Sequence, residues 1–236
     1  MTQLVQMIRR HEKTDRSLDG KLADRPTPEG FANAYRKGIE LGEQYGSKGF
    51  EIRGVHSGTC RTFQCCTAYL LGAGVALLPN ISYSSRLNMI SLSEQESDYM
   101  RNIKDKEEQY HTIFTRYLKE LTAAGSNVAD FVISQCENYK MRGMRCKGNL
   151  SLSPFPSLNV ELSHGSVMDA AYLILSGKEV NFDNAARETG FFPEGEGFDV
   201  AFPFQKFNGI YRAEIMLKGK PEIYPLEELR ERVIKR

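Results

Sequence analysis

Three short strand-like runs in the chain each end in polar residues that include arginine or histidine, and each is followed by a helical segment. The runs are residues 4–8, 50–55 and 158–162. Arg10 and His11 follow the first, Arg61 follows the second after a short loop, and His164 follows the third. Ligands of an open α/β sheet bind outside the carboxyl ends of its strands. These four side chains are therefore the first candidates for a functional site.

Helix-start signals lie close to the candidate side chains. Thr27 suits the N-cap of a helix over residues 28–45, because a threonine hydroxyl satisfies a free backbone N–H and proline is favoured at the first helical position. A second helix begins near Arg61 and breaks at Gly72. Arg61 thus lies in a first helical turn, where the helix dipole disfavours a cation unless an anion is bound nearby. The mismatch indicates an anion site.

Residues 80–155 follow a different pattern, a serine-rich stretch followed by charged helical segments at about 94–124 and 128–142. We interpret this block as a helical insertion packed on the sheet. Residues 198–204 and 209–217 predict two neighbouring strands.

Two shorter segments complete the prediction. Residues 75–79 are either a short strand or a packed connection, and residues 225–236 predict a short surface helix.

Composition narrows the class of protein. The 236 residues favour one large domain over two small ones. With 31 basic and 30 acidic residues, the chain has no charge excess typical of nucleic-acid or membrane-surface binding. No apolar run approaches the roughly 20 residues that span a bilayer, and no leader pattern opens the chain, so we expect a cytoplasmic protein. The five cysteines lack paired metal-ligand spacing and favour a reduced compartment.

The candidate side chains suit one kind of ligand. Guanidinium groups bind the oxygens of a phosphoryl group in pairs, and imidazoles can donate to it or attack it. The order along the chain is Arg10 with His11, the Thr-Pro-Glu-Gly helix start at Thr27, Arg61 before a helix, and the Ser-His-Gly turn at Ser163. In that order, from Leu4 to about Leu217, the chain resembles the histidine phosphatase superfamily, which includes the cofactor-dependent phosphoglycerate mutases.

The resemblance implies an α/β fold: a three-layer α/β/α sandwich with a mostly parallel central sheet. It further implies one domain over residues 1–236, with a variable helical insertion at about 80–155. It implies no metal and no cofactor. The sequence contains no feature that specifies an oligomeric state.

The resemblance also implies roles for individual residues. His11 is the nucleophile that forms a phosphohistidine, while Arg10, Arg61 and His164 form the phosphate pocket. Glu94, with Glu96 as the next candidate, is the proton donor to the leaving oxygen. For this chemistry His11 must attack through an unprotonated ring nitrogen, while a hydrogen bond to the other nitrogen fixes the tautomer.

The chain departs from the family pattern at three positions. Glu12 replaces the usual glycine, and its carboxylate would repel a phosphate unless it points away. Ser17 stands where mutase-like members commonly have an asparagine that contacts phosphate. Gly165 replaces the aspartate of the acid-phosphatase branch, which disfavours that branch, and Asp169 one helical turn later is expected to be structural.

The function implied is hydrolysis of a phosphomonoester, with a phosphorylated small molecule or phosphopeptide as substrate. A mutase-like phosphotransferase would use the same chemistry but retain the phosphoryl group for a second acceptor. A non-catalytic phosphate-binding or scaffolding protein of the same fold is the alternative from another class, because Glu12 and the missing acid motif permit it.

Overall fold

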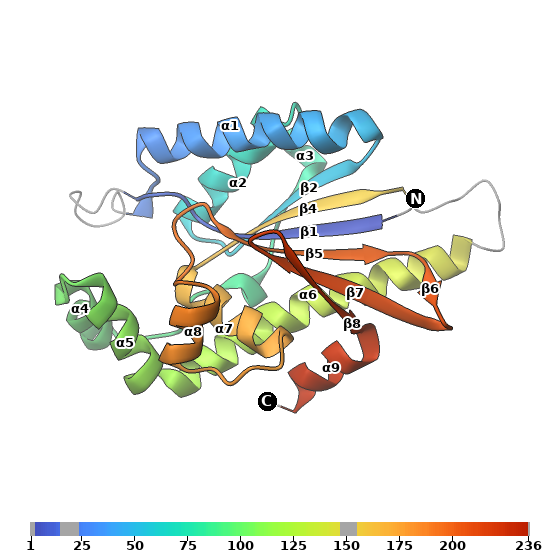
Figure 1. Ribbon diagram of the computed structural model, residues 1–236. Coiled ribbons are helices and arrows are strands. Elements are labelled where there is room, and N and C mark those ends of the chain that lie inside the picture. The colour runs from blue at the N-terminus through green and yellow to red at the C-terminus, as the bar shows by residue number, and fades with distance from the viewer. Residues whose placement is uncertain (1–2, 15–23, 147–154, 236) are drawn as a thin grey trace.

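A central β-sheet lies between two layers of helices in the computed structural model, which describes residues 3–14, 24–146 and 155–235 (Figure 1). The strand order is β3-β2-β4-β1-β5-β7-β6, and β8 pairs with β7. The strands are β1 (Gln3–Arg10), β2 (Glu51–His56), β3 (Ile81–Tyr83), β4 (Ser157–Ser163), β5 (Gly197–Pro203), β6 (Lys206–Phe207), β7 (Ile210–Leu217) and β8 (Lys220–Pro225). The predicted three-layer α/β/α class is confirmed.

The parallel half of the sheet brings three strand ends to one edge. β1 and β2 both pair with β4 in parallel, and the antiparallel strand β5 lies on the other side of β1. Arg10 pairs with Ser163, and His56 pairs with Leu162, so the three strands end nearly level. The segments that follow β1, β2 and β4 therefore start side by side.

One helical layer consists of α1 (Pro28–Tyr45), α2 (Cys60–Gly72) and the short α3 (Leu77–Asn80), above the sheet in Figure 1. Thr27 caps α1 as predicted, since its hydroxyl accepts from the Gly30 N–H at 3.0 Å. Buried side chains of α1, α2 and the sheet, including Leu41, Leu70 and Val160, form the core of this layer.

The opposite layer contains α6 (Leu118–Cys146), α7 (Gly165–Leu175), α8 (Phe182–Glu188) and α9 (Leu226–Ile234). The helices α4 (Glu94–Asn102) and α5 (Lys106–Arg116) lie toward the sheet edge at which β1 ends (Figure 1). The larger hydrophobic core fills the space between these helices and the sheet. The α-helices between β3 and β4 thus extend one layer over the edge where the candidate site lies.

The predicted helix boundaries between residues 94 and 142 are wrong in three places. The first segment is interrupted twice. Asp105 caps α5 by accepting from the Glu108 N–H at 2.8 Å, and α5 ends at Arg116, before α6 begins at Leu118. The predicted break after Ala124 does not occur, and α6 runs through it. A Cβ on Gly125 would lie only 2.6 Å from the Ala170 Cβ, so this glycine serves close packing of α6 on α7 rather than helix termination.

The remaining elements are partly as predicted. Of the two alternatives for residues 75–79 the strand is wrong, since β3 begins later, at Ile81. β5 and β7 are antiparallel neighbours, and α9 is the predicted last helix. The pattern missed β8, which forms a hairpin with β7 through Lys218 and Gly219, both at positive φ. Across the described residues no helix combines the length and the apolar character needed to cross a membrane.

Candidate phosphate site

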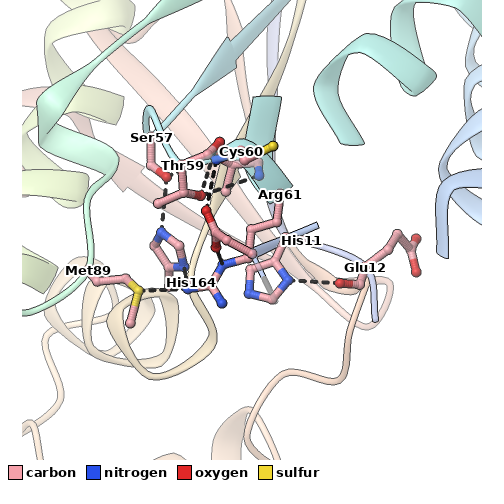
Figure 2. Close-up of polar contacts among 10 residues, drawn as sticks. His11, Glu12, Ser57, Thr59, Cys60, Arg61, Met89 and His164 are labelled. Carbon is pink, nitrogen blue, oxygen red and sulfur yellow. Dashed lines mark hydrogen bonds and ion pairs between the residues drawn. The ribbon is translucent and has the colours of Figure 1, made fainter. Parts of the chain in front are cut away.

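Three of the candidate residues, His11, Arg61 and His164, meet at the edge where the parallel strands end (Figure 2). His11 directly follows β1, and His164 directly follows β4. Their ring centroids lie 5.5 Å apart. Arg61 extends from the first turn of α2, whose N-cap is Thr59. Since α2 and α7 both begin here, the positive ends of two helix dipoles favour an anion at this position.

The backbone carbonyl of the next residue holds the His11 ring in one orientation. The ring is buried, and Nδ1 lies 2.8 Å from the carbonyl oxygen of Glu12. A carbonyl can only accept a hydrogen bond, so we assign the proton of the neutral ring to Nδ1. Nε2 is then the unprotonated nitrogen. This carbonyl is the tautomer-fixing partner that the sequence does not reveal.

His164 is buried beside cationic groups. Its Nε2 lies 3.0 Å from the hydroxyl oxygen of Ser57, and its Nδ1 lies 3.5 Å from an Arg61 guanidinium nitrogen. Burial lowers the pKa of His164 well below the ordinary histidine value, and His11, Arg61 and Arg10 lower this pKa further. The ring is therefore neutral near pH 7, and an anion bound among these groups would raise its pKa again.

Arg61 is paired with a carboxylate from the chain itself. Its Nε lies 3.3 Å from Oδ1 of Asp24, and one Nη donates toward the sulfur of Met89 at 2.8 Å. Oδ2 of Asp24 accepts from the backbone N–H of Cys60, at the first position of α2. Asp24 thus supplies the anion that an arginine in a first helical turn requires.

Arg10 links the site to two other segments. Its Nη1 donates to the hydroxyl of Tyr110 on α5 and to the carbonyl of Phe192, both at 2.8 Å. The N–H of Phe192 in turn donates to Asp169 on α7. Asp169 is fully buried, and burial raises its pKa to about 7. This carboxyl supports the segment that orients Arg10, which agrees with the structural role expected for it.

Glu12 points away from the site (Figure 2). Its carboxylate is buried and accepts from the Lys37 ammonium at 3.1 Å, and Lys37 also donates to the carbonyl of Gly195. Lys37 neutralises the charge of Glu12 on the far side of the backbone from His11. A carboxylate at this position would repel a phosphate unless it pointed away from the site, and the Glu12 carboxylate does point away.

The two candidate proton donors have different surroundings. Glu94 is the first residue of α4 and is exposed, and no hydrogen bond or ion pair joins it to the described residues around His11. Glu96 accepts from the N–H and the hydroxyl of Ser93 in a capping box. These hydrogen bonds lower the pKa of Glu96, which keeps it deprotonated and unsuited to donate a proton. The assignment of Glu94 stays a prediction, and Ser17 lies outside the described residues.

Sequence reasoning missed several of the partners that shape the site: Asp24, Lys37, Ser57 and Tyr110. Ser57 carries a weak signal, because it follows β2 at the same sheet edge as His164. The other three lie in a loop or on helices, and nothing in their local sequence marks them. Within the described ranges no group of three or more histidine, cysteine or acidic side chains could hold a metal ion.

No family model and no curated protein matches the sequence. The structure is similar to that of a mycobacterial glucosyl-3-phosphoglycerate phosphatase, with a TM-score of 0.56 and 15% identity over 85% of this chain and 90% of the other. A protein described as mycobacterial hydrolase 1 gives a TM-score of 0.55 and 13% identity over 94% and 99% of the two chains. Bacillus stearothermophilus YhfR gives 0.53 and 14% over 95% and 96%. At these identities the likeness establishes the fold, and the chain therefore shares the three-layer fold of these proteins over nearly its whole length.

Proposed function

We propose that the protein is a phosphomonoester hydrolase that works through a phosphohistidine at His11. One observation carries the proposal: the carbonyl of Glu12 binds Nδ1 of a buried histidine, which leaves Nε2 as the nucleophilic nitrogen. The arginine and histidine that meet His11 at this edge have the charge and hydrogen-bonding capacity to hold a phosphoryl group. The fold is also that of a phosphatase, which agrees with the proposal.

The reaction would have two steps. In the first, Nε2 of His11 forms a bond to phosphorus, the bond from phosphorus to the leaving oxygen breaks, and that oxygen takes a proton from an acid, for which Glu94 is the candidate. In the second, water attacks phosphorus and its proton passes to the conjugate base of that acid, the N–P bond breaks, and phosphate leaves. Arg10, Arg61 and His164 would hold the phosphoryl oxygens throughout. Arg61 would exchange Asp24 for the substrate phosphate.

A phosphorylated small molecule or a phosphopeptide would be the substrate. The mycobacterial neighbour is named for a phosphorylated sugar acid, so this fold accommodates phosphorylated small molecules. The leaving group must be recognised by residues outside the phosphate pocket, because the pocket would contact only the phosphoryl group.

Trapping of the intermediate tests the mechanism. Wild-type protein mixed with a ³²P-labelled ester and quenched in alkali should carry acid-labile label, and His11→Ala should carry none and release no phosphate from p-nitrophenyl phosphate. His111→Ala is the matched control, because His111 is an exposed histidine on α5. Equal labelling of the His11→Ala variant and wild type would exclude His11 as the nucleophile.

The second candidate is a non-catalytic protein that binds phosphate groups. The exposed position of Glu94 favours it, because no hydrogen bond or ion pair joins this candidate proton donor to the described residues around His11. Wild-type protein that binds phosphate but neither acquires label nor hydrolyses p-nitrophenyl phosphate would establish this candidate.

A further inference from the structure

A cavity of about 560 Å³ lies beside Arg10, on the side of α5. Three segments line it: Arg10 from β1, Lys106 with Glu107 and Tyr110 from α5, and Phe191 with Glu194 from the segment after α8. The volume falls in the range of small-molecule sites. None of the roles argued above uses this cavity.

The cavity adjoins the phosphate site through Arg10. Nη1 of Arg10 binds the hydroxyl of Tyr110, which lines the cavity. A Cβ on Gly165, the residue after His164, would lie 2.8 Å from that hydroxyl and 3.1 Å from Cζ of Arg10. Arg10 thus separates the cavity from His164. An ester whose phosphoryl group is held by Arg10 can place its leaving group in the cavity.

Aromatic rings form one wall of the cavity. The Tyr110 and Phe191 rings lie 4.5 Å apart between centroids, at 30° to each other. Phe182 also packs against Phe191, at 5.0 Å between ring centroids. The rings pack on one another, and together they give the cavity apolar area against which a further ring can pack. A ring-bearing leaving group therefore suits it better than a short polar chain.

The charged side chains of the cavity carry a net negative charge once phosphate is bound. The phosphate neutralises Arg10, and the remaining charged side chains are one cation, Lys106, and two carboxylates, Glu107 and Glu194. Within the described part of the chain, no ion pair joins these three side chains to one another or to other groups. The excess carboxylate charge favours a leaving group that carries an ammonium and opposes one that carries a carboxylate.

We infer that the cavity is the leaving-group site and that it selects aryl phosphates bearing an ammonium group. The inference rests on the proposed function for the position of the phosphoryl group. Tyr110 and Phe191 provide the apolar surface for the ring, while Glu107 and Glu194 provide the attraction for the ammonium.

Three esters with the same ring test the selection: phenyl phosphate, tyramine O-phosphate and the phosphate ester of 3-(4-hydroxyphenyl)propionate. Binding to the His11→Ala variant, measured by calorimetry, reports the cavity without turnover. Tyramine O-phosphate should bind about two- to fivefold tighter for each carboxylate that it meets, the range for partly exposed ion pairs, and the propionate ester should bind weakest.

Variants identify the source of the preference. Glu107→Gln with Glu194→Gln, introduced into the His11→Ala background, should abolish the advantage of tyramine O-phosphate. Because Lys106 is then the remaining charge of the three, the propionate ester should no longer bind weakest. Glu108→Gln is the matched control, since Glu108 neighbours Glu107 on α5 but does not line the cavity, and it should leave the preference unchanged. Phe191→Ala should weaken all three aryl esters relative to inorganic phosphate.

The outcomes separate the two proposals. Equal binding of the three esters, or a preference that survives the double substitution, would overturn the cavity inference. Failure of the wild type to hydrolyse any of the esters would instead overturn the proposed hydrolase, and the binding order would still decide the role of the cavity.

Discussion

Asp24 and Arg61 form an ion pair at the start of α2, with Oδ1 of Asp24 3.3 Å from Nε of Arg61. Oδ2 of the same carboxylate accepts from the Cys60 N–H. Both partners are ones that a phosphate would use, a guanidinium and a helix N-terminus. Asp24 therefore competes with a phosphoryl group for the same donors.

Asp24→Asn should accordingly strengthen the binding of phosphate or vanadate. The pair is partly exposed, so the gain should be about two- to fivefold, the range for ion pairs in contact with solvent. Isothermal titration with vanadate measures it. Asp183→Asn, in the first turn of α8, controls for the change in net charge. Unchanged or weaker vanadate binding would contradict the competition.

Tyr110→Phe should weaken phosphate binding through Arg10. The hydroxyl of Tyr110 accepts one of two hydrogen bonds from Arg10 Nη1, and the Phe192 carbonyl accepts the other, both at 2.8 Å. Without the hydroxyl the guanidinium is less well oriented. Hydrogen bonds to charged groups contribute about 1.5 to 3 kcal/mol. Tyr110→Phe should lose part of this binding energy, which raises the KM for p-nitrophenyl phosphate or the dissociation constant for vanadate. Tyr99→Phe, at an exposed tyrosine of α4, should change neither quantity.

Glu161 should make the free energy of unfolding depend on pH. The residue is fully buried in β4, and burial raises its pKa to about 8. Because the folded state then binds a proton that the unfolded state releases at its ordinary, lower pKa, the stability falls as the pH rises toward 8, by up to about 1.4 kcal/mol per pH unit. Above pH 8 the full cost of the buried carboxylate is present.

Urea unfolding between pH 6.5 and 8.5 tests this dependence. The lower limit avoids the titration of His164, whose lowered pKa has the opposite effect, a loss of stability as the pH falls below the ordinary histidine value. Glu161→Gln should flatten the decline, and Glu40→Gln, on the exposed face of α1, should not. An unchanged slope in Glu161→Gln would show that another group, such as Asp169, is responsible.

The sequence predicted which candidate side chains meet where the backbone topology decides their positions. His11 and His164 lie 153 positions apart, yet each directly follows a parallel strand, and parallel strands end at one edge. The apolar runs that predict the strands therefore also predict the meeting of the two rings. The position of Arg61 was predicted for a related reason. Arg61 lies at the start of the helix that follows β2, and that helix begins at the same edge of the sheet.

The parts that were not predicted depend on contacts between side chains from distant elements. Glu12 is tolerated because Lys37 of α1 lies behind it. Arg10 is oriented by Tyr110, which reaches it from 100 positions away. No local pattern encodes such pairs, since they follow from how α1 and α5 pack. The continuation of α6 past Ala124 was not predicted for the same reason, because Gly125 packs closely against Ala170 on a neighbouring helix.

The proton donor is the assignment on which turnover most depends, and Glu94→Gln tests it. p-Nitrophenolate leaves with little help from an acid, whereas an alkoxide requires protonation. If Glu94 is the donor, Glu94→Gln should slow an alkyl phosphate such as glycerol 2-phosphate by about 10²- to 10⁴-fold and p-nitrophenyl phosphate far less. Glu108→Gln on α5 controls for the charge change and should slow neither ester.

The structure also indicates which residue to test if Glu94 fails. Equal slowing of both esters, or no slowing of either, would mean that another group protonates the leaving oxygen. Glu96 is then a poor choice, because its capping box keeps its pKa low. Tyr110 is the better one, since its hydroxyl lies beside Arg10 and lines the cavity that we assign to the leaving group. In that case Tyr110→Phe should slow the alkyl ester more than the aryl ester. Weaker phosphate binding alone cannot produce this difference, because both esters present the same phosphoryl group.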